Sequence, residues 1–207
     1  MAFQIDRCIL GPIEANCYIV RPQGEKKALI IDPGDDYDTL KKALSDLQVE
    51  VGAIVVTHGH FDHLLSAAYL REDTGAEIYV SAEDATALTD ARASLSPTGT
   101  ITPFRKTDKV TLLPEGSFDI CSLHFTVIKT PGHTRGGICL YNEDEKLIFT
   151  GDTLFDDSFG RTDLPGGDFQ VLVQSLKMLL KLPGDTTVYS GHGDSALISD
   201  IRKVLCS

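Results

Sequence analysis

Residues 57–63 read T-H-G-H-F-D-H, which places three imidazoles and one carboxylate within six positions. The apolar run Ala53–Val56 comes directly before this motif and predicts a buried strand, and the apolar segment 64–70 after it predicts a helix. The motif therefore falls in a turn at the C-terminal end of a strand. Open α/β sheets form their ligand sites at such strand ends.

The residue types of the motif indicate a metal site. His58 and His60 can point to one side of an extended backbone, and Asp62 and His63 lie beyond a bend where they can serve a second position. The alternative is a group of ordinary surface histidines. However, three of the six histidines of the chain fall within these six positions, and histidine is the commonest metal ligand. Imidazole and carboxylate groups suit zinc, and imidazole also suits iron.

Three further apolar strands end in a glycine-flanked histidine or aspartate, at His133, Asp152 and His192. Each of these residues alone is weak evidence for a metal ligand, because Pro-Gly-His and Gly-Asp are common in turns and helix caps. Together with the motif they supply seven ligand-type side chains, which fits two metals a few ångström apart with one bridging carboxylate. The remaining histidine, His124, lies within an alternating strand and is interpreted as structural.

Asp32 follows the predicted strand 28–31 and precedes Pro33 and Gly34. Two interpretations stay open for this residue. Its carboxylate could form an Asx-turn, or it could orient a metal-bound histidine from behind.

The composition predicts one globular domain over residues 1–207. The hydrophobic fraction is 42% and the charged fraction 24%, as in ordinary soluble proteins. The formal charge of −11 disfavours nucleic acid as a partner. No apolar stretch approaches the length of a membrane span, and no secretory signal is evident. We therefore expect a cytoplasmic protein.

The cysteines agree with a reducing compartment. They are odd in number, form no C-x-x-C pair and fall mostly in apolar strand-like runs. We expect them to be reduced and mostly buried; they are Cys8, Cys17, Cys121, Cys139 and Cys206.

The hydrophobic pattern predicts two echoing halves, each with strands first and strand–helix pairs after them. The segment 92–107 is irregular and predicts either a variable surface connection or a lid. Ser81–Asp84 is typical of a helix start. The other helices are expected at 36–47, 64–73, 168–181 and 195–205, and strands at 2–10, 16–21, 28–31, 53–56, 77–80, within 110–149 and at 187–190.

The chain resembles the metallo-β-lactamase-fold hydrolase superfamily from about residue 8 to residue 193. T-H-G-H-F-D-H matches the signature H-x-H-x-D-H, and P-G-H-T, G-D-T-L-F and S-G-H-G follow in the order typical of that superfamily. The resemblance implies an α/β fold, a four-layer αβ/βα sandwich, with the metals at one edge between two mixed sheets.

The resemblance also implies a ligand set and catalytic carboxylates. The closest group is the glyoxalase II-like hydrolases, whose short members share the run 151–168. Asp62 and Asp152 would be the catalytic carboxylates. One metal would be held by His58, His60 and His133, a second by Asp62, His63 and His192, with Asp152 bridging both.

The function implied is hydrolysis of a thioester such as S-lactoylglutathione, or a related small acyl-thiol, by a hydroxide held between two divalent ions. Zinc is favoured, with iron or manganese as alternatives. The sequence ends at Ser207, without the C-terminal extension that helps glyoxalase II to bind glutathione, and the glutathione-contacting tyrosines are not evident. Glutathione selectivity is therefore not implied.

Arg161 is the best candidate for binding a substrate carboxylate, through a bidentate ion pair. The alternative is a structural pair of Arg161 with Asp163 or Asp168.

Two other functions stay open. A mononuclear iron persulfide dioxygenase would share the G-R-T-D element at 160–163 but use only two histidines and one aspartate. A lactonase or β-lactamase would use the same fold on a cyclic substrate. We expect a monomer or a homodimer.

Overall fold

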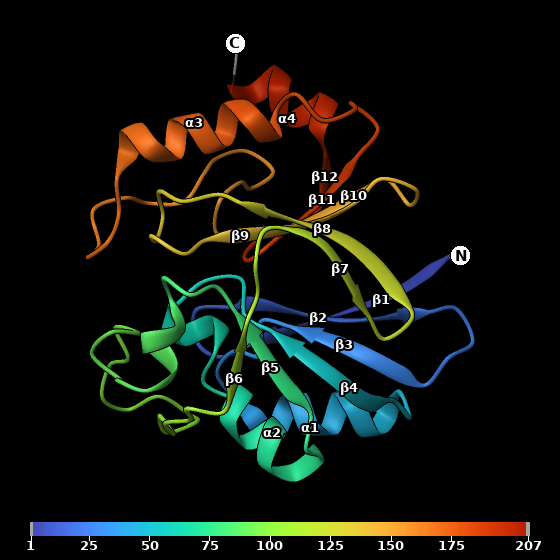
Figure 1. Cartoon of the computed structure of the whole chain (residues 1–207), viewed down its shortest axis with the longest axis vertical. Helices are drawn as coiled ribbons and strands as arrows, with labels where there is room; N and C mark the ends of the chain where they lie inside the picture. The colour runs from blue at the N-terminus through green and yellow to red at the C-terminus, as the bar shows by residue number, and fades with distance from the viewer. Residues whose placement is uncertain (1, 206–207) are drawn as a thin grey trace.

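The computed structural model describes residues 2–205. Two mixed sheets face each other, helices α1 and α2 cover the outer face of the first sheet, and α3 and α4 cover that of the second (Figure 1). This arrangement confirms the four-layer αβ/βα sandwich. The helices are α1 (Tyr37–Asp46), α2 (Ala67–Thr74), α3 (Phe169–Leu179) and α4 (Ile198–Leu205).

The first sheet has the strand order β1-β2-β3-β4-β5-β6. Its first three strands pair antiparallel, and the pairs from β3 to β6 are parallel. Parallel pairing brings the C-terminal ends of β3, β4 and β5 to one edge. The strands are β1 (Phe3–Leu10), β2 (Ala15–Pro22), β3 (Lys27–Ile31), β4 (Glu50–Val55), β5 (Glu77–Val80) and β6 (Val110–Leu112).

The second sheet has the strand order β12-β11-β10-β9-β8-β7. Only β10 and β11 run parallel, so their C-terminal ends share an edge. The strands are β7 (Gly116–Ile120), β8 (Leu123–Lys129), β9 (Ile138–Asn142), β10 (Leu147–Gly151), β11 (Thr187–Ser190) and β12 (Ala196–Leu197).

Three apolar clusters hold the four layers together. One packs the first sheet on α1 and α2 and includes Ile30 and Leu40. A second lies between the sheets and contains the aromatic side chains of Phe125 and Phe149. The third packs the second sheet on α3 and α4 around Leu172.

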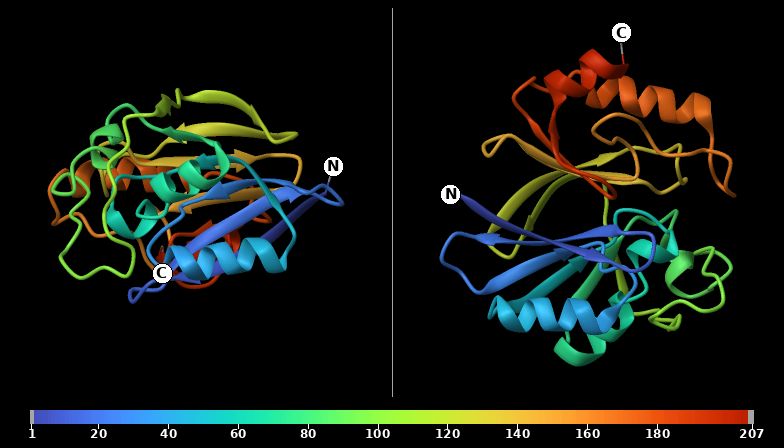
Figure 2. Two further views of the ribbon diagram at one scale, coloured as in Figure 1. Left: turned by 90° about the horizontal axis from the view of Figure 1, so that it is seen from below. Right: turned by 180° about the vertical axis from the view of Figure 1, so that it is seen from behind.

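The loop between β5 and β6 and the loop between β10 and α3 lie at the same edge of the sandwich, as the front and rear views both show (Figures 1 and 2). The first of these loops contains residues 92–107, which are irregular as predicted. The second carries residues 152–168. Both loops therefore border the edge where β4, β10 and β11 end.

Three predicted helix starts are wrong. The helix expected from residue 64 begins at Ala67, because residues 64–66 form a turn after the short 3-10 helix Phe61–His63. Ser81–Asp84 does not start an α-helix: only a short 3-10 turn, Ala85–Leu88, follows, and the Asp84 side chain does not cap it. The last helix begins at Ile198 rather than 195, because Ala196 and Leu197 pair with β11 as a short strand.

The four cysteines within residues 2–205 are free thiols, with Cys17 and Cys139 buried and Cys8 and Cys121 half-buried. Cys206 lies outside the described residues. Within the same range, no helix is long and apolar enough to cross a membrane.

Phe149 should be a large contributor to stability. It is 1% exposed, and its ring lies 5.1 Å from Tyr18 and 5.2 Å from Tyr189, centroid to centroid. We expect Phe149→Ala to lower the free energy of unfolding by about 3–5 kcal/mol, because truncation leaves a cavity between the sheets. Urea denaturation of the metal-free protein measures this. Phe169→Ala, at a site 49% exposed, is the control and should change it by less than about 1 kcal/mol. Equal losses of unfolding free energy in the two variants would contradict the assignment of Phe149 to the core between the sheets.

Candidate metal centre

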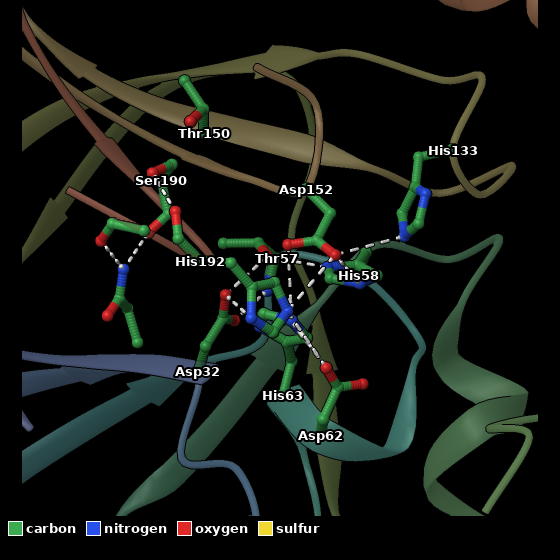
Figure 3. A network of polar contacts seen from close by, with 12 residues as sticks. Asp32, Thr57, His58, Asp62, His63, His133, Thr150, Asp152, Ser190 and His192 are labelled. Atoms are coloured by element: carbon green, nitrogen blue, oxygen red, sulfur yellow. Dashed lines mark hydrogen bonds and ion pairs between the residues drawn. The ribbon is translucent and has the colours of Figure 1, made fainter. Parts of the chain in front are cut away.

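The seven ligand-type side chains predicted from the sequence converge at one edge of the sandwich, and Figure 3 labels all of them except His60. His58, His60, Asp62 and His63 follow β4. The others each follow a strand of the second sheet: His133 comes after β8, Asp152 after β10 and His192 after β11. The edge is the one where parallel strands end, which explains how distant residues meet.

The first group consists of His58, His60 and His133. One ring nitrogen from each lies within 4.8 Å of the other two, and all three side chains are buried. The rings of His60 and His133 stand at 88° to each other with their centroids 4.5 Å apart. Three imidazoles in this arrangement can hold one divalent ion.

The second group consists of Asp62, His63 and His192. The Oδ2 atom of Asp62 lies 3.3 Å from Nε2 of His63 and 3.2 Å from Nε2 of His192. His192 is the most exposed member, with 28% of its side chain accessible. This group provides two nitrogens and one oxygen for a second ion.

Asp152 lies between the two groups. Its Oδ2 atom is 3.6 Å from Nε2 of His133 and 3.6 Å from Nε2 of His192, and its Oδ1 atom is 3.4 Å from Nε2 of His63. Figure 3 shows its carboxylate aimed into the space between the rings. A carboxylate in this place can bridge two ions.

Hydrogen bonds behind three of the rings turn their Nε2 atoms inward. Nδ1–H of His133 donates to the Arg161 carbonyl at 2.7 Å. His63 Nδ1 lies 3.1 Å from the Asp32 carboxylate, and His58 Nδ1 lies 3.2 Å from Thr57 Oγ1. A partner on Nδ1 fixes the tautomer that leaves the Nε2 lone pair free for a metal.

Asp32 is the hub of this support. Its two oxygens accept from the backbone N–H and from the hydroxyl of Thr57, both at 2.7 Å, in addition to the contact with His63. Its backbone has φ of 53°, in the left-handed region. Such strain in a non-glycine residue is typical of functional sites. The Asp32 carboxylate therefore contacts the ring of His63, which is the arrangement required if Asp32 orients a metal-bound histidine.

A third grouping, Asp32 with His58 and His63, also has its ligand atoms within 4.8 Å of one another. Its carboxylate oxygens already accept hydrogen bonds from Thr57. We therefore assign Asp32 to orienting the rings rather than to holding an ion.

The atoms that face the centre fit a cation. Within the described part of the chain, Nε2 of His58, His63 and His133 and Oδ1 of Asp152 are buried without a hydrogen-bond partner. Burying unpaired polar atoms costs free energy, and four of them aimed at one space are explained by ions that they would coordinate. The donor set of imidazole and carboxylate suits Zn, Fe or Mn.

Burial keeps the first group ready for a metal. It lowers the pKa of His58 well below the usual value for histidine, and it lowers the pKa of His60 to about 3. Both rings are therefore neutral near pH 7, which is the form that binds metal.

Carboxylates dominate the second group. Burial lowers the pKa of His63, but the charges of Asp62 and Asp152 outweigh it and hold that pKa well above the usual value. Burial also lowers the pKa of His192, but the hydrogen bond to Asp62 and the charge of Asp152 together raise it above the usual value. Burial raises the pKa of Asp62, but the positive charge on His63 and the hydrogen bonds from His192 and His63 together hold it well below its usual value. The group is therefore built to hold positive charge.

Asp84 supports the loops of the centre through hydrogen bonds that the sequence did not reveal. Its buried carboxylate accepts from the N–H of Gly59, the hydroxyl of Thr134 and the N–H of Gly136, at 2.8, 2.6 and 2.9 Å. It thus ties the turn that carries His58 and His60 to the loop that carries His133. A sequence pattern of a helix start concealed this role.

Gly191 allows Asp152 to approach. A Cβ atom at this position would lie 2.2 Å from Oδ1 of Asp152 and 2.7 Å from Cε1 of His63. Any side chain there would push the two groups apart.

A cavity of about 570 Å³ lies in front of the centre, a volume typical of small-molecule sites. His60, Asp62, His133, Asp152 and His192 form its base. Its walls are largely apolar and are formed by Ile13, Phe61, Leu95, Phe155, Phe159 and Leu164.

Arg161 also lines this cavity, but its guanidinium group is paired with Asp163. Nε and Nη2 of Arg161 donate to the two carboxylate oxygens, each at 2.7 Å. Asp168 instead caps α3, accepting from the N–H of Val171. Of the two structural partners considered for Arg161, Asp163 and Asp168, the structure therefore shows the pair with Asp163.

A sandwich of this topology with this His/Asp centre defines a class of metal-dependent hydrolases. The sequence-family model of the metallo-beta-lactamase superfamily matches residues 10–192 of this chain. The chain belongs to that superfamily, which confirms the resemblance drawn from the motifs.

Relatives cover nearly the whole chain. A hydroxyacylglutathione hydrolase, GloC, of Haemophilus influenzae is 32% identical over 198 residues, which is 92% of this chain and 91% of that protein. The crystal structure of BLEG-1, a B3 metallo-beta-lactamase, has a TM-score of 0.88 at 36% identity and covers 97% of each chain. That of TTHA1623 in a di-iron-bound form has a TM-score of 0.87 at 33% identity, covering 96% of this chain and 98% of the other.

Asp84→Ala should weaken metal binding by the first group. Loss of three hydrogen bonds lets the His133 loop move relative to the turn after β4, and losing support of this kind costs about 10–100-fold in metal affinity. Competition with a chromophoric chelator measures the affinity, and circular dichroism verifies folding. Asp90→Ala, on the surface, is the control. Unchanged affinity in folded Asp84→Ala protein would contradict the assignment.

Proposed function

We propose that this protein is a hydrolase that uses two divalent metal ions to cleave thioesters, with S-lactoylglutathione or a related acyl-thiol as substrate. One observation supports it above the others: Asp152 lies within 3.6 Å of nitrogens from both ligand groups. A carboxylate shared in this way fits a two-ion centre, in which Asp62 and Asp152 provide the catalytic carboxylates.

Two bound cations would supply a hydroxide at neutral pH and would polarise the substrate carbonyl. The protein's own residues hold the geometry. Asp32 and the Arg161 carbonyl fix the rings of His63 and His133. The walls of the cavity in front of Asp152 are largely apolar.

The nature of the leaving group favours a thioester. Among the described residues that line the cavity, those outside the ligand set are apolar or glycine except Arg161, whose side chain stays protonated. A thiolate leaves without needing a proton, so a lining without a further proton donor suits thioester cleavage.

The relatives support the proposal at two points. GloC is named as a hydrolase of a glutathione thioester, and TTHA1623 has been crystallised with two irons. Histidine and aspartate ligands suit zinc, which we propose as the resident metal, with iron as the alternative. We further propose a monomer or homodimer in the cytoplasm, where the four free thiols would stay reduced.

Metal content and turnover should be measured on the same sample. We expect two ions per chain and hydrolysis of S-lactoylglutathione, both lost on chelation and restored by adding metal back. Elemental analysis measures the metal content, and release of the thiol measures the turnover. Two ions without turnover of any thioester would overturn the proposal.

Ligand variants provide a sharper test. Asp152→Ala and His192→Ala should each lower kcat/KM by roughly a hundredfold or more, since metal stabilisation of the transition state is worth several kcal/mol. His124→Ala is the matched control, because this exposed histidine pairs with Asp119 far from the centre. Retained thioesterase activity in both ligand variants would contradict the proposal.

A mononuclear iron persulfide dioxygenase is the second candidate. It is favoured by the position of Asp152, whose Oδ2 is 4.0 Å from His58 Nε2 and 3.6 Å from His133 Nε2. These three residues alone could hold one iron, with Asp62, His63 and His192 as a structural cluster. One iron per chain with oxygen uptake on glutathione persulfide would favour this function.

A further inference from the structure

We infer that the cavity in front of the metal centre selects thioesters with an apolar acyl group on a thiol that carries no anionic groups. This inference rests on the proposed thioester hydrolysis and adds the substrate class. It follows from two features of the loops around the centre: a preformed apolar wall, and an arginine whose charge is already paired with Asp163.

The apolar wall begins directly beside the ligands. The ring of Phe155 meets His192 edge-on, with centroids 6.3 Å apart. Phe159 packs against Phe169 at 6.1 Å. Across the cavity stands Ile13, from the turn between β1 and β2. When the substrate carbonyl reaches the metal centre at the base of the cavity, one of its two substituents lies against this wall, and we assign the acyl group to it.

This wall is held in place by the fold. Leu154 is fully buried in the cluster under α3, and it forms a bridge with Phe159. The N–H of Phe155 donates to the Ser158 carbonyl at 2.9 Å, which closes the small loop. A wall that is ordered in advance favours binding because less conformational freedom is lost.

Two of the apolar side chains that line the cavity are exposed. Ile13 is 49% exposed and Phe159 is 39% exposed. An apolar ligand between them would remove this surface from water, and burial of apolar surface is favourable in proportion to its area. A small hydroxylated acyl group, such as lactoyl, would leave much of it wet.

The charge of the arginine beside the cavity is already paired with a carboxylate. Nε and Nη2 of Arg161, which form one edge of its guanidinium group, donate to the two oxygens of Asp163. The pair is exposed and therefore weak in itself, but Asp163 is tethered two residues away. A diffusing carboxylate has to compete with this high local concentration. The formal charge of −11 further opposes an anionic ligand.

Non-hydrolysable thioethers test the inference by binding, independently of turnover. Calorimetry on the metal-loaded protein would compare S-hexyl-N-acetylcysteamine, S-methyl-N-acetylcysteamine and S-hexylglutathione. We expect the first to bind at least about tenfold more tightly than either of the others, since one methylene in an apolar pocket can change binding tenfold or more. Tighter binding of S-hexylglutathione, or no effect of chain length, would overturn the inference.

Matched variants locate the effect. Ile13→Ala should abolish most of the gain from the hexyl chain, whereas Ile9→Ala should leave it intact, because Ile9 is equally exposed at 51% but lies outside the cavity. Asp163→Asn should release Arg161 and strengthen binding of S-hexylglutathione severalfold. Equal effects of the two isoleucine variants would contradict the assigned wall.

Turnover separates the inference from the proposed function. We expect S-hexanoyl-N-acetylcysteamine to exceed S-lactoylglutathione in kcat/KM by about tenfold or more. The reverse order overturns the inference while leaving thioester hydrolysis intact. Absence of all turnover, with the binding order as expected, overturns the proposed function and retains the apolar site.

Discussion

Hydrogen bonds across the edge where the two sheets meet set the distances between the ligands. The Thr57 carbonyl accepts from Ile138 N at 3.0 Å, and the Gly191 carbonyl accepts from Asn16 N at 2.7 Å. Asp84 adds a third link, from the turn after β4 to the loop of His133. Each ligand group draws members from both halves of the chain. A metal in either group would therefore also hold the halves together, because binding to the folded form alone stabilises it.

The same edge concentrates buried charge. Without cations, Asp62 and Asp152 depend on protonated imidazoles, which explains why the pKa of His63 is held high despite burial. The rings of His58 and His60 are neutral because burial disfavours their charged forms. One side of the centre is thus charge-compensated and the other is uncharged. Two positive ions bridged by Asp152 would satisfy both sides, since coordination replaces the missing partners of the buried nitrogens.

Local patterns were sufficient for most of the fold because they report local physics. The strand before Thr57, the helix over 36–47 and the final Gly-flanked His192 all follow from apolar periodicity and turn residues. The role of Asp84 was not predicted, because its contacts are not local in the sequence. Its sequence neighbourhood is that of a helix cap, and its actual partners, Gly59 and Gly136, are 25 and 52 residues away. Whether Arg161 meets Asp163 or a ligand is likewise a matter of side-chain geometry that no spacing rule decides.

Metal chemistry and substrate choice have separate structural origins in this protein. The ligands follow strand ends and are fixed by the sheets, while most of the cavity wall comes from three other connections, at Ile13, Leu95 and the loop 154–164; only Phe61 comes from the turn that carries ligands. Loops can change without disturbing the strands that carry the centre. Membership of the superfamily therefore accounts for the base of the cavity but not for its walls. Arg161 lines the cavity and forms a bidentate pair with Asp163, so the charge selectivity that we infer for this site depends on the loop 152–168 rather than on the strands that carry the ligands.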